Sequence, residues 1–131
     1  MKSHQGVSQR QEAQAERALL NAVLTVRTVD ECRAFFRDLC TPAELQALAD
    51  RWAVVGLLQE GLPYREIHKL TGVSVTTIGR VARYLAAGNG GYRLAADRLK
   101  GTADRSRSER SPQTLSPADG RQAAMDKSRH G

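Results

Sequence analysis

Apolar residues in the first two-thirds of the chain recur every three or four positions, which is the period of an α-helix with one buried face. One such stripe runs from Ala15 to Val26, and a second runs from Val29 to Leu39. Alternating apolar and polar runs, which are typical of β-strands, are absent. The pattern predicts an all-α fold. A third stripe consists of Leu45, Leu48, Trp52, Val55 and Leu58.

Capping residues predict where these helices begin and end. Thr28 is followed three positions later by Glu31, which is the spacing of a capping box. The stretch Thr41-Pro42-Ala43-Glu44 combines a capping threonine, a proline at the first helical position and a glutamate at the third. Gly61 is expected to end the third helix in a left-handed conformation.

Residues 62–85, LPYREIHKLTGVSVTTIGRVARYL, predict two short helices that meet at a glycine. The first covers about Tyr64 to Thr71, Gly72 permits the turn, and Ser74 caps a helix that reaches about Ala87. This arrangement is that of a helix-turn-helix over about residues 63–86, with the recognition helix at about 74–86. The predicted packing positions are Ile67, Leu70, Val73, Ile78, Val81 and Leu85.

The outer face of the predicted recognition helix suits the major groove of DNA. At about 100° per residue, Thr76, Arg80 and Arg83 lie opposite the packing positions, and residues 74–85 contain no acid. The threonine methyl and hydroxyl groups can contact base edges, and arginine can form two hydrogen bonds with guanine or phosphate. A glycine allows the helix backbone to come close to the DNA. Basic residues one turn apart on the preceding helix suit phosphate contacts. The predicted DNA-binding residues are Arg65, Lys69, Ser74, Thr76, Thr77, Gly79, Arg80 and Arg83.

Charge and composition divide the 131 residues further. The net charge is +6, and residues 61–100 alone hold seven basic and two acidic residues, a net charge of +5, which favours a polyanionic partner. After Lys100 the only large apolar residues are Leu115 and Met125, too few to offset the entropy of ordering. We therefore expect a disordered N-terminal arm at 1–11, a helical DNA-binding and dimerisation domain at 12–100, and a disordered basic tail at 101–131.

Several function classes lack a sequence signal. Cys32 and Cys40 are eight positions apart, which predicts two reduced thiols in a cytosolic protein rather than a zinc or redox motif. The N-terminus has no apolar stretch of a secretory signal, and no run approaches the roughly 18 apolar residues of a membrane span. For a catalytic site, the sequence offers no combination of a nucleophile, a general base and a residue that would orient the base. We expect no enzyme, metal site, cofactor or membrane association, and a bacterial cytoplasmic protein associated with the nucleoid.

Four stretches carry a resemblance to a known family: FFRDLCTPAE, YREI, TGVSVTTIGRV and GNGGYRL. Over about residues 18–99 the chain resembles the trp repressor superfamily, specifically its YerC/YecD-like branch. The resemblance implies an intertwined all-helical homodimer. Its N-terminal helices interlock across the two-fold axis, and each protomer presents one helix-turn-helix to double-stranded DNA.

The resemblance also implies a possible ligand pocket. The trp repressor binds L-tryptophan between its third helix and its recognition helix, and Thr41, Arg51 and Arg80 match the residue types that contact the ligand. Val81 and Tyr84, however, stand where the repressor has glycine and serine, and both add bulk where the indole would lie. We therefore predict no binding of L-tryptophan, assign Arg80 to DNA and leave any other small-molecule effector open.

The leading prediction is a sequence-specific transcriptional regulator of the repressor type that acts as a homodimer. One alternative is a DNA-packaging or recombination adaptor, such as a small terminase subunit, that uses the same motif. The other is a protein-interaction module whose basic face meets an acidic partner.

Overall fold

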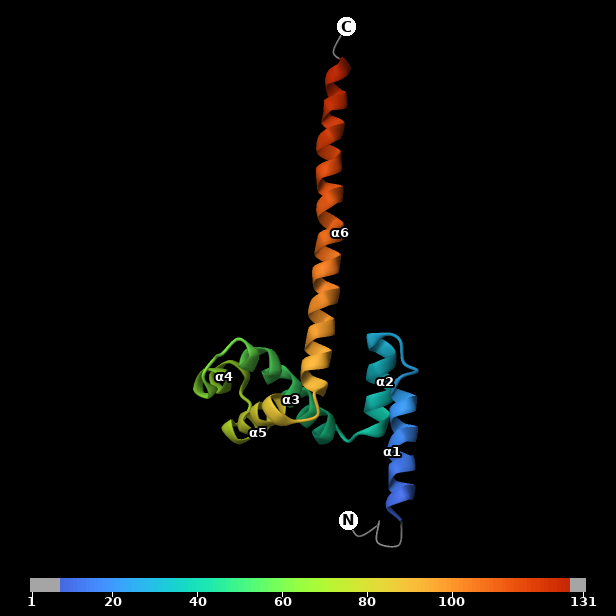
Figure 1. Ribbon diagram of the computed structural model, residues 1–131, viewed down its shortest axis with the longest axis vertical. Helices are drawn as coiled ribbons and strands as arrows, with labels where there is room; N and C mark the ends of the chain where they lie inside the picture. Colours follow the sequence, from blue (N-terminus) through green and yellow to red (C-terminus); the bar gives the residue numbers. More distant parts are fainter. Residues whose placement is uncertain (1–7, 128–131) are drawn as a thin grey trace. The chain divides into compact units, whose positions relative to one another are not determined.

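The computed structural model describes the backbone of residues 8–127 and the side chains of residues 8–109. Within these ranges every regular element is an α-helix, as predicted, and there is no strand (Figure 1). It divides into two compact units, and the division falls inside the third helix, between Ala49 and Asp50. The helices are α1 (Gln9–Val23), α2 (Val29–Leu39), α3 (Pro42–Gln59), α4 (Tyr64–Thr71), α5 (Val75–Ala87) and α6 (Gly91–Lys127).

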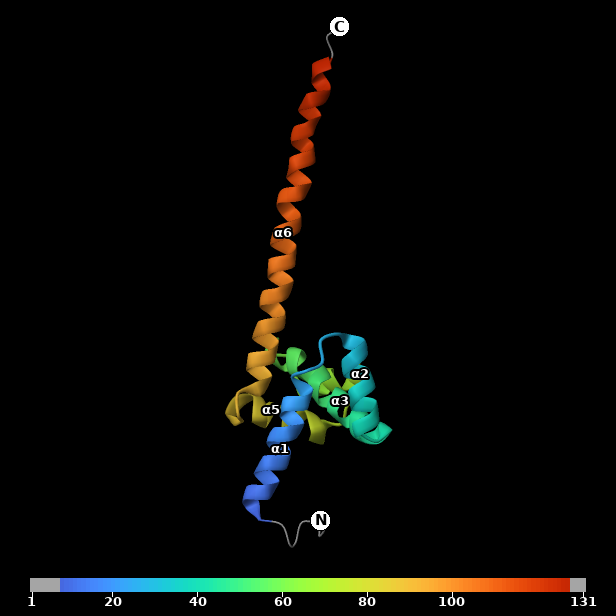
Figure 2. The same cartoon turned by 90° about the vertical axis from the view of Figure 1, so that its right-hand side faces the viewer.

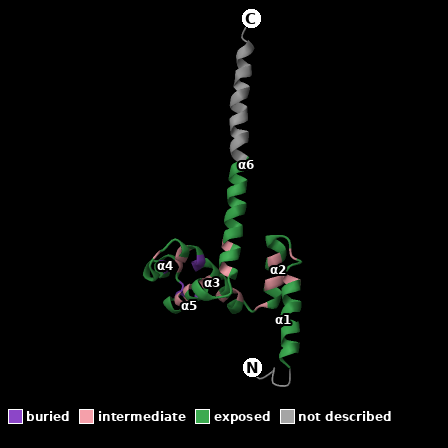
Figure 3. Cartoon of the chain, viewed as in Figure 1, coloured by how far each residue is buried: buried purple, intermediate pink, exposed green. Residues whose placement is uncertain are grey.

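The first unit contains α1, α2 and the first turns of α3. None of residues 8–49 is buried, and Figure 3 shows these helices only as exposed or intermediate. Large apolar side chains lie in solvent, among them Leu24 with 81% and Val29 with 72% of its surface exposed. The apolar stripes that predicted these helices are thus present but cover no core within the unit.

The first helix begins earlier than expected. The Ser8 hydroxyl accepts from the Gln11 amide at 3.1 Å, and the Gln11 side chain accepts from the Ser8 amide at 3.0 Å. This reciprocal capping box starts α1 at Gln9, so residues 8–11 differ from the predicted disordered arm. The Ser-x-x-Gln spacing was the sequence signal for it. Residues 1–7 of that arm lie outside the described residues.

The caps of α2 and α3 differ in one respect. At α2, Thr28 accepts from the Glu31 amide at 3.1 Å, but the Glu31 carboxylate accepts from the Arg27 amide at 2.8 Å instead of from Thr28. The capping box predicted for α2 therefore forms only in half. At α3 a complete box forms: Glu44 accepts from the Thr41 amide at 2.8 Å, and Thr41 accepts from the Glu44 amide at 3.1 Å. The predicted starts of both helices are confirmed.

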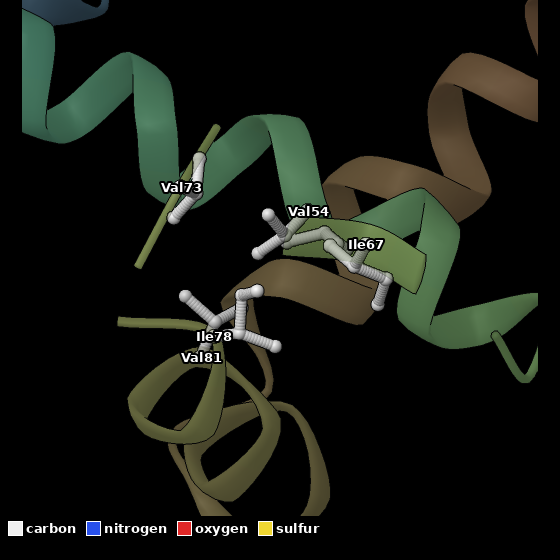
Figure 4. Packing of buried hydrophobic residues seen from close by; sticks show 6 residues of the cluster. Val54, Ile67, Val73, Ile78 and Val81 are labelled. Atoms are coloured by element: carbon white, nitrogen blue, oxygen red, sulfur yellow. The ribbon is translucent and has the colours of Figure 1, made fainter. Parts of the chain in front are cut away.

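The core of the second unit lies between α3, α4 and α5 (Figure 4). Leu70, predicted to pack, is 64% exposed, because the eight residues of α4 turn only Ile67 fully inward. Val54 of α3 is buried in addition to the predicted Val55. The buried side chains are Val54, Val55, Ile67, Val73, Ile78 and Val81, with Leu57, Leu58, Leu62, Leu85 and Tyr92 packed partly against them.

The last helix is the largest departure from the sequence-based expectation. In place of the disordered tail expected from residue 101, α6 continues to Lys127, as the orange-to-red helix in Figure 2 shows. Residues 101–109 are all exposed, and Thr102 Oγ1 donates locally, to the Arg98 carbonyl one turn earlier at 3.0 Å. The backbone of a helix forms its hydrogen bonds within the helix, so the lack of burial after Lys100 did not by itself exclude helical structure there. The last four residues, 128–131, are outside the described part.

Candidate nucleic-acid interface

The turn between α4 and α5 is held by its own side chains. Gly72 has φ of +76°, the left-handed conformation that favours glycine, and its amide donates to the His68 carbonyl at 2.8 Å. Thr71 Oγ1 donates to the Ile67 carbonyl at 2.7 Å and accepts from the Val73 amide at 3.0 Å. His68 Nδ1 lies 2.7 Å from the Val73 carbonyl. These bonds, together with the buried aliphatic side chains, fix how α5 leaves α4.

Ser74 and Thr77, both predicted to touch DNA, are engaged with each other at the start of α5. The Ser74 hydroxyl accepts from the Thr77 amide and donates to Thr77 Oγ1, each at 3.1 Å. Ser74 is therefore the N-cap that the sequence predicted. Thr77 is only partly exposed, so the hydroxyls of this pair hold the first turn of the helix.

Thr76, Arg80 and Arg83 form the exposed stripe of α5. All three are exposed, whereas Ile78 and Val81 on the opposite side have no exposed surface. Arg65 and Lys69 are exposed one turn apart on α4, which contacts α5 directly. The helix-turn-helix therefore carries four exposed cations on two helices that are packed against each other.

Gly79 does not occupy the position that the sequence suggested. It is partly buried, and a Cβ added to it would lie 3.9 Å from Cε2 of Tyr64 on α4. Gly79 therefore faces the ring of Tyr64 and not an open surface. A methyl group would make only an ordinary contact there, so the packing of α5 on α4 does not require glycine at this position.

The two bulky residues of the expected ligand pocket lie in different surroundings. Val81 is fully buried in the core, as an aliphatic filler would be. Tyr84 instead turns outward with 41% of its surface exposed, and the guanidinium carbon of Arg80 lies 4.7 Å from its ring centroid. Tyr84 thus does not fill the space beneath the recognition helix.

A surface hollow of about 370 Å³ lies at the end of α5, lined by Arg80, Tyr84, Asn89, Gly91 and Tyr92. Thr41 and Arg51 do not line it. Thr41 caps α3 in the first unit, and Arg51 is partly buried on α3 in the second unit. The structure therefore groups only Arg80 and Tyr84 among the residues that the resemblance assigned to a ligand.

Val75 is a candidate contact that sequence reasoning missed. It is the first residue of α5, and 51% of its surface is exposed beside Thr76. Its aliphatic type favoured a core position. The signal that could have identified it is its place directly after the cap, because the N-terminal residues of a recognition helix contact base edges.

Other kinds of site are not found among the described residues. No group of three or more His, Cys, Asp or Glu side chains could hold a metal ion there. In the same part of the chain, no helix has both the length and the apolar character needed to cross a bilayer. Cys32 and Cys40 are free thiols and partly buried.

Comparison with known proteins gives the family. A family model described as Trp repressor protein matches residues 14–100. The uncharacterized protein YerC of Bacillus subtilis is 45% identical over 91 residues, which cover 70% of this chain and 88% of YerC.

Two solved structures agree with this assignment. A TrpR-like protein from Eubacterium eligens is 40% identical with a TM-score of 0.64, over 66% of this chain and 90% of that one. A candidate Trp repressor from Staphylococcus aureus is 37% identical with a TM-score of 0.65, over 71% and 95%. The chain therefore belongs to the Trp repressor family, in the branch that includes YerC.

Proposed function

We propose that the protein is a sequence-specific DNA-binding transcriptional regulator of the repressor type, acting as a homodimer in the bacterial cytoplasm at the nucleoid. One observation carries the proposal: a rigidly turned helix-turn-helix whose second helix exposes Thr76, Arg80 and Arg83 and contains no acid. Arginine pairs with guanine through two hydrogen bonds, and threonine meets the thymine methyl group or a base edge.

The roles of the cations divide between the two helices. Arg80 and Arg83 on α5 read bases, whereas Arg65 and Lys69 on α4 bind phosphates and set the register. Val75 adds an apolar contact to a thymine methyl group at the start of α5. Ser74 and Thr77 hold the first turn of α5, and Gly79 lies against Tyr64 of α4. These three residues contribute to DNA binding only through the position of α5.

The homodimer is supported by the first unit. None of its described residues is buried. Even large apolar side chains are at least half exposed, namely Leu20, Leu24, Val29 and Leu39. An amphipathic helix is stabilised mainly by packing of its apolar face, so α1 and α2 need a partner surface. A second copy supplies an equally apolar surface, as expected of an isologous interface.

Selection of bound duplexes from a random DNA pool tests the proposal. A regulator enriches a two-fold symmetric site whose half-sites are about one helical turn apart, near 10 base pairs. A packaging or recombination adaptor enriches no symmetric site, and a protein-interaction module enriches none at all. Either of those results would replace the proposed function.

The salt dependence of binding separates the two groups of cations. On the selected duplex, Arg65→Ala is expected to weaken binding to all sequences alike and to reduce the slope of log affinity against log salt by about 2, one phosphate per protomer. Arg80→Ala is expected to reduce the preference for the selected site. An unchanged slope for Arg65→Ala would contradict the phosphate assignment.

Light scattering tests the dimer at micromolar protein. The 131-residue chain is expected at twice its monomer mass of 14.3 kDa. Leu24→Asp places a charge on the most exposed of these apolar side chains and is expected to shift the mass toward the monomer. Leu70→Asp, which alters a similarly exposed leucine on α4, is the matched control. A monomeric mass for the wild-type protein would contradict the proposed homodimer.

A further inference from the structure

Tyr84 and Arg80 form a pair on the face of α5 that the proposed function aims at DNA. The guanidinium carbon of Arg80 lies 4.7 Å from the centroid of the Tyr84 ring, one helical turn away. A cation within about 6 Å of a ring centroid is attracted by the ring electrons. Arg80 is an exposed side chain with many rotamers, so this contact restricts where its guanidinium points.

The Tyr84 ring lies close to the backbone of Gly88. A Cβ added to Gly88 would lie 3.0 Å from Cδ1 of the ring and would collide with the Tyr84 carbonyl oxygen. That carbonyl accepts from the Gly88 amide at 2.9 Å. Glycine at position 88 therefore leaves room for the ring and for the end of α5.

The start of α6 is held against its neighbours by side-chain contacts. Arg93 Nε donates to the Leu85 carbonyl at 3.1 Å and so ties the first turn of α6 to the end of α5. The Tyr92 ring packs near Trp52 of α3, with ring centroids 6.3 Å apart. These contacts tie the first turn of α6 both to α3 and to the end of α5, and Tyr92 and Tyr84 line the same surface hollow.

We propose that Tyr84 is a positioning residue that holds the Arg80 side chain in the direction needed to read a guanine edge. The inference rests on the proposed function and deepens it. Stacking uses the face of the guanidinium and leaves its in-plane N–H donors free for the two acceptors of guanine. Holding the side chain before DNA arrives reduces the rotamer freedom lost on binding.

The test is a double-mutant cycle measured by fluorescence anisotropy on the selected duplex and on a scrambled duplex. Tyr84→Phe keeps the ring and is expected to bind within about twofold of the wild type. Tyr84→Leu removes the ring electrons and is expected to weaken binding to the selected duplex about 5- to 25-fold, because both protomers lose the contact. Binding to the scrambled duplex is expected to change by less than about twofold, since phosphates dominate it.

The Arg80→Ala background separates positioning from a general structural role. In that background Tyr84→Leu is expected to cause no further loss, because the side chain that it positions is gone. A loss that persists there, or an equal loss on both duplexes, would overturn the proposal. If Tyr84→Leu lowers the melting temperature, Tyr84→Gln at this half-exposed position provides the same comparison.

Failure of this inference and failure of the proposed function give different results. If Arg80→Ala weakens binding to the selected duplex but Tyr84→Leu does not, only the positioning role is overturned. If no duplex is selected, or Arg80→Ala binds as the wild type does, the assignment of α5 to DNA fails as well.

Discussion

Two Gly→Ala substitutions seven residues apart are expected to change stability in opposite directions. Gly72 has φ of +76° at the turn, and nothing lies within 4 Å of a Cβ added there. Its substitution therefore acts through the backbone alone, where the left-handed conformation costs about 1–2 kcal/mol for a residue with a Cβ. Gly79 lies within α5, where alanine is favoured over glycine by about 0.8–1 kcal/mol. Its new methyl group would make an ordinary contact with Tyr64 at 3.9 Å.

Urea denaturation followed by far-UV circular dichroism measures both effects. All three proteins are compared at one protomer concentration, because dimerisation makes the apparent stability depend on concentration. The free energies of unfolding of the two variants are expected to differ by about 2–3 kcal/mol, with the wild type between them. A shift of both variants in the same direction would refute the account of the turn or of the α4–α5 contact.

The Gly79→Ala variant also tests how close α5 approaches DNA. Because its methyl group faces Tyr64, the variant is expected to bind the selected duplex as the wild type does. A more stable protein with weaker DNA binding would instead show that Gly79 is needed for close approach, as the sequence alone suggested.

Three further outcomes are expected. Replacing a contacted thymine with uracil weakens binding of the wild type but not of Val75→Ala, as measured by anisotropy, and an equal loss for both would remove Val75 from the interface. A chain that ends after Lys100 keeps a cooperative thermal melt, because residues 101–109 pack against nothing described, and loss of that melt would make the tail structural. Millimolar L-tryptophan gives no saturable heat in titration calorimetry and no change in DNA affinity, whereas a saturable signal with tighter DNA binding would restore a corepressor model.

The helix-turn-helix was predictable because its signals are local. Ser74 as a cap, Gly72 at the turn and the spacing of Ile78 and Val81 each depend on neighbours within one or two helical turns. These signals gave the bounds of α4 and α5 almost without error.

Features that depend on contacts between helices were less accessible. Gly79 was taken for an open position because the helical wheel carries no information about Tyr64 on the neighbouring helix. Tyr84 was placed beneath α5 because the resemblance matches it to a serine at the ligand, whereas its ring is partly exposed beside Arg80. The length of α6 was missed because the shortage of large apolar residues after Lys100 indicates only that this segment buries little surface. It carries no information on the hydrogen bonds within a helix.

The central claim is that Arg80 and Arg83 of α5 bind DNA in a sequence-dependent way. The most direct test is the affinity of Arg83→Ala for the selected duplex, compared with Arg98→Ala, which removes the same charge from an exposed position on α6. A loss of about 5- to 150-fold is expected for Arg83→Ala, corresponding to about 1–3 kcal/mol, and a loss of less than about twofold for Arg98→Ala. Equal losses for the two variants would contradict the central claim, because the attraction would then come from net charge and not from the recognition helix.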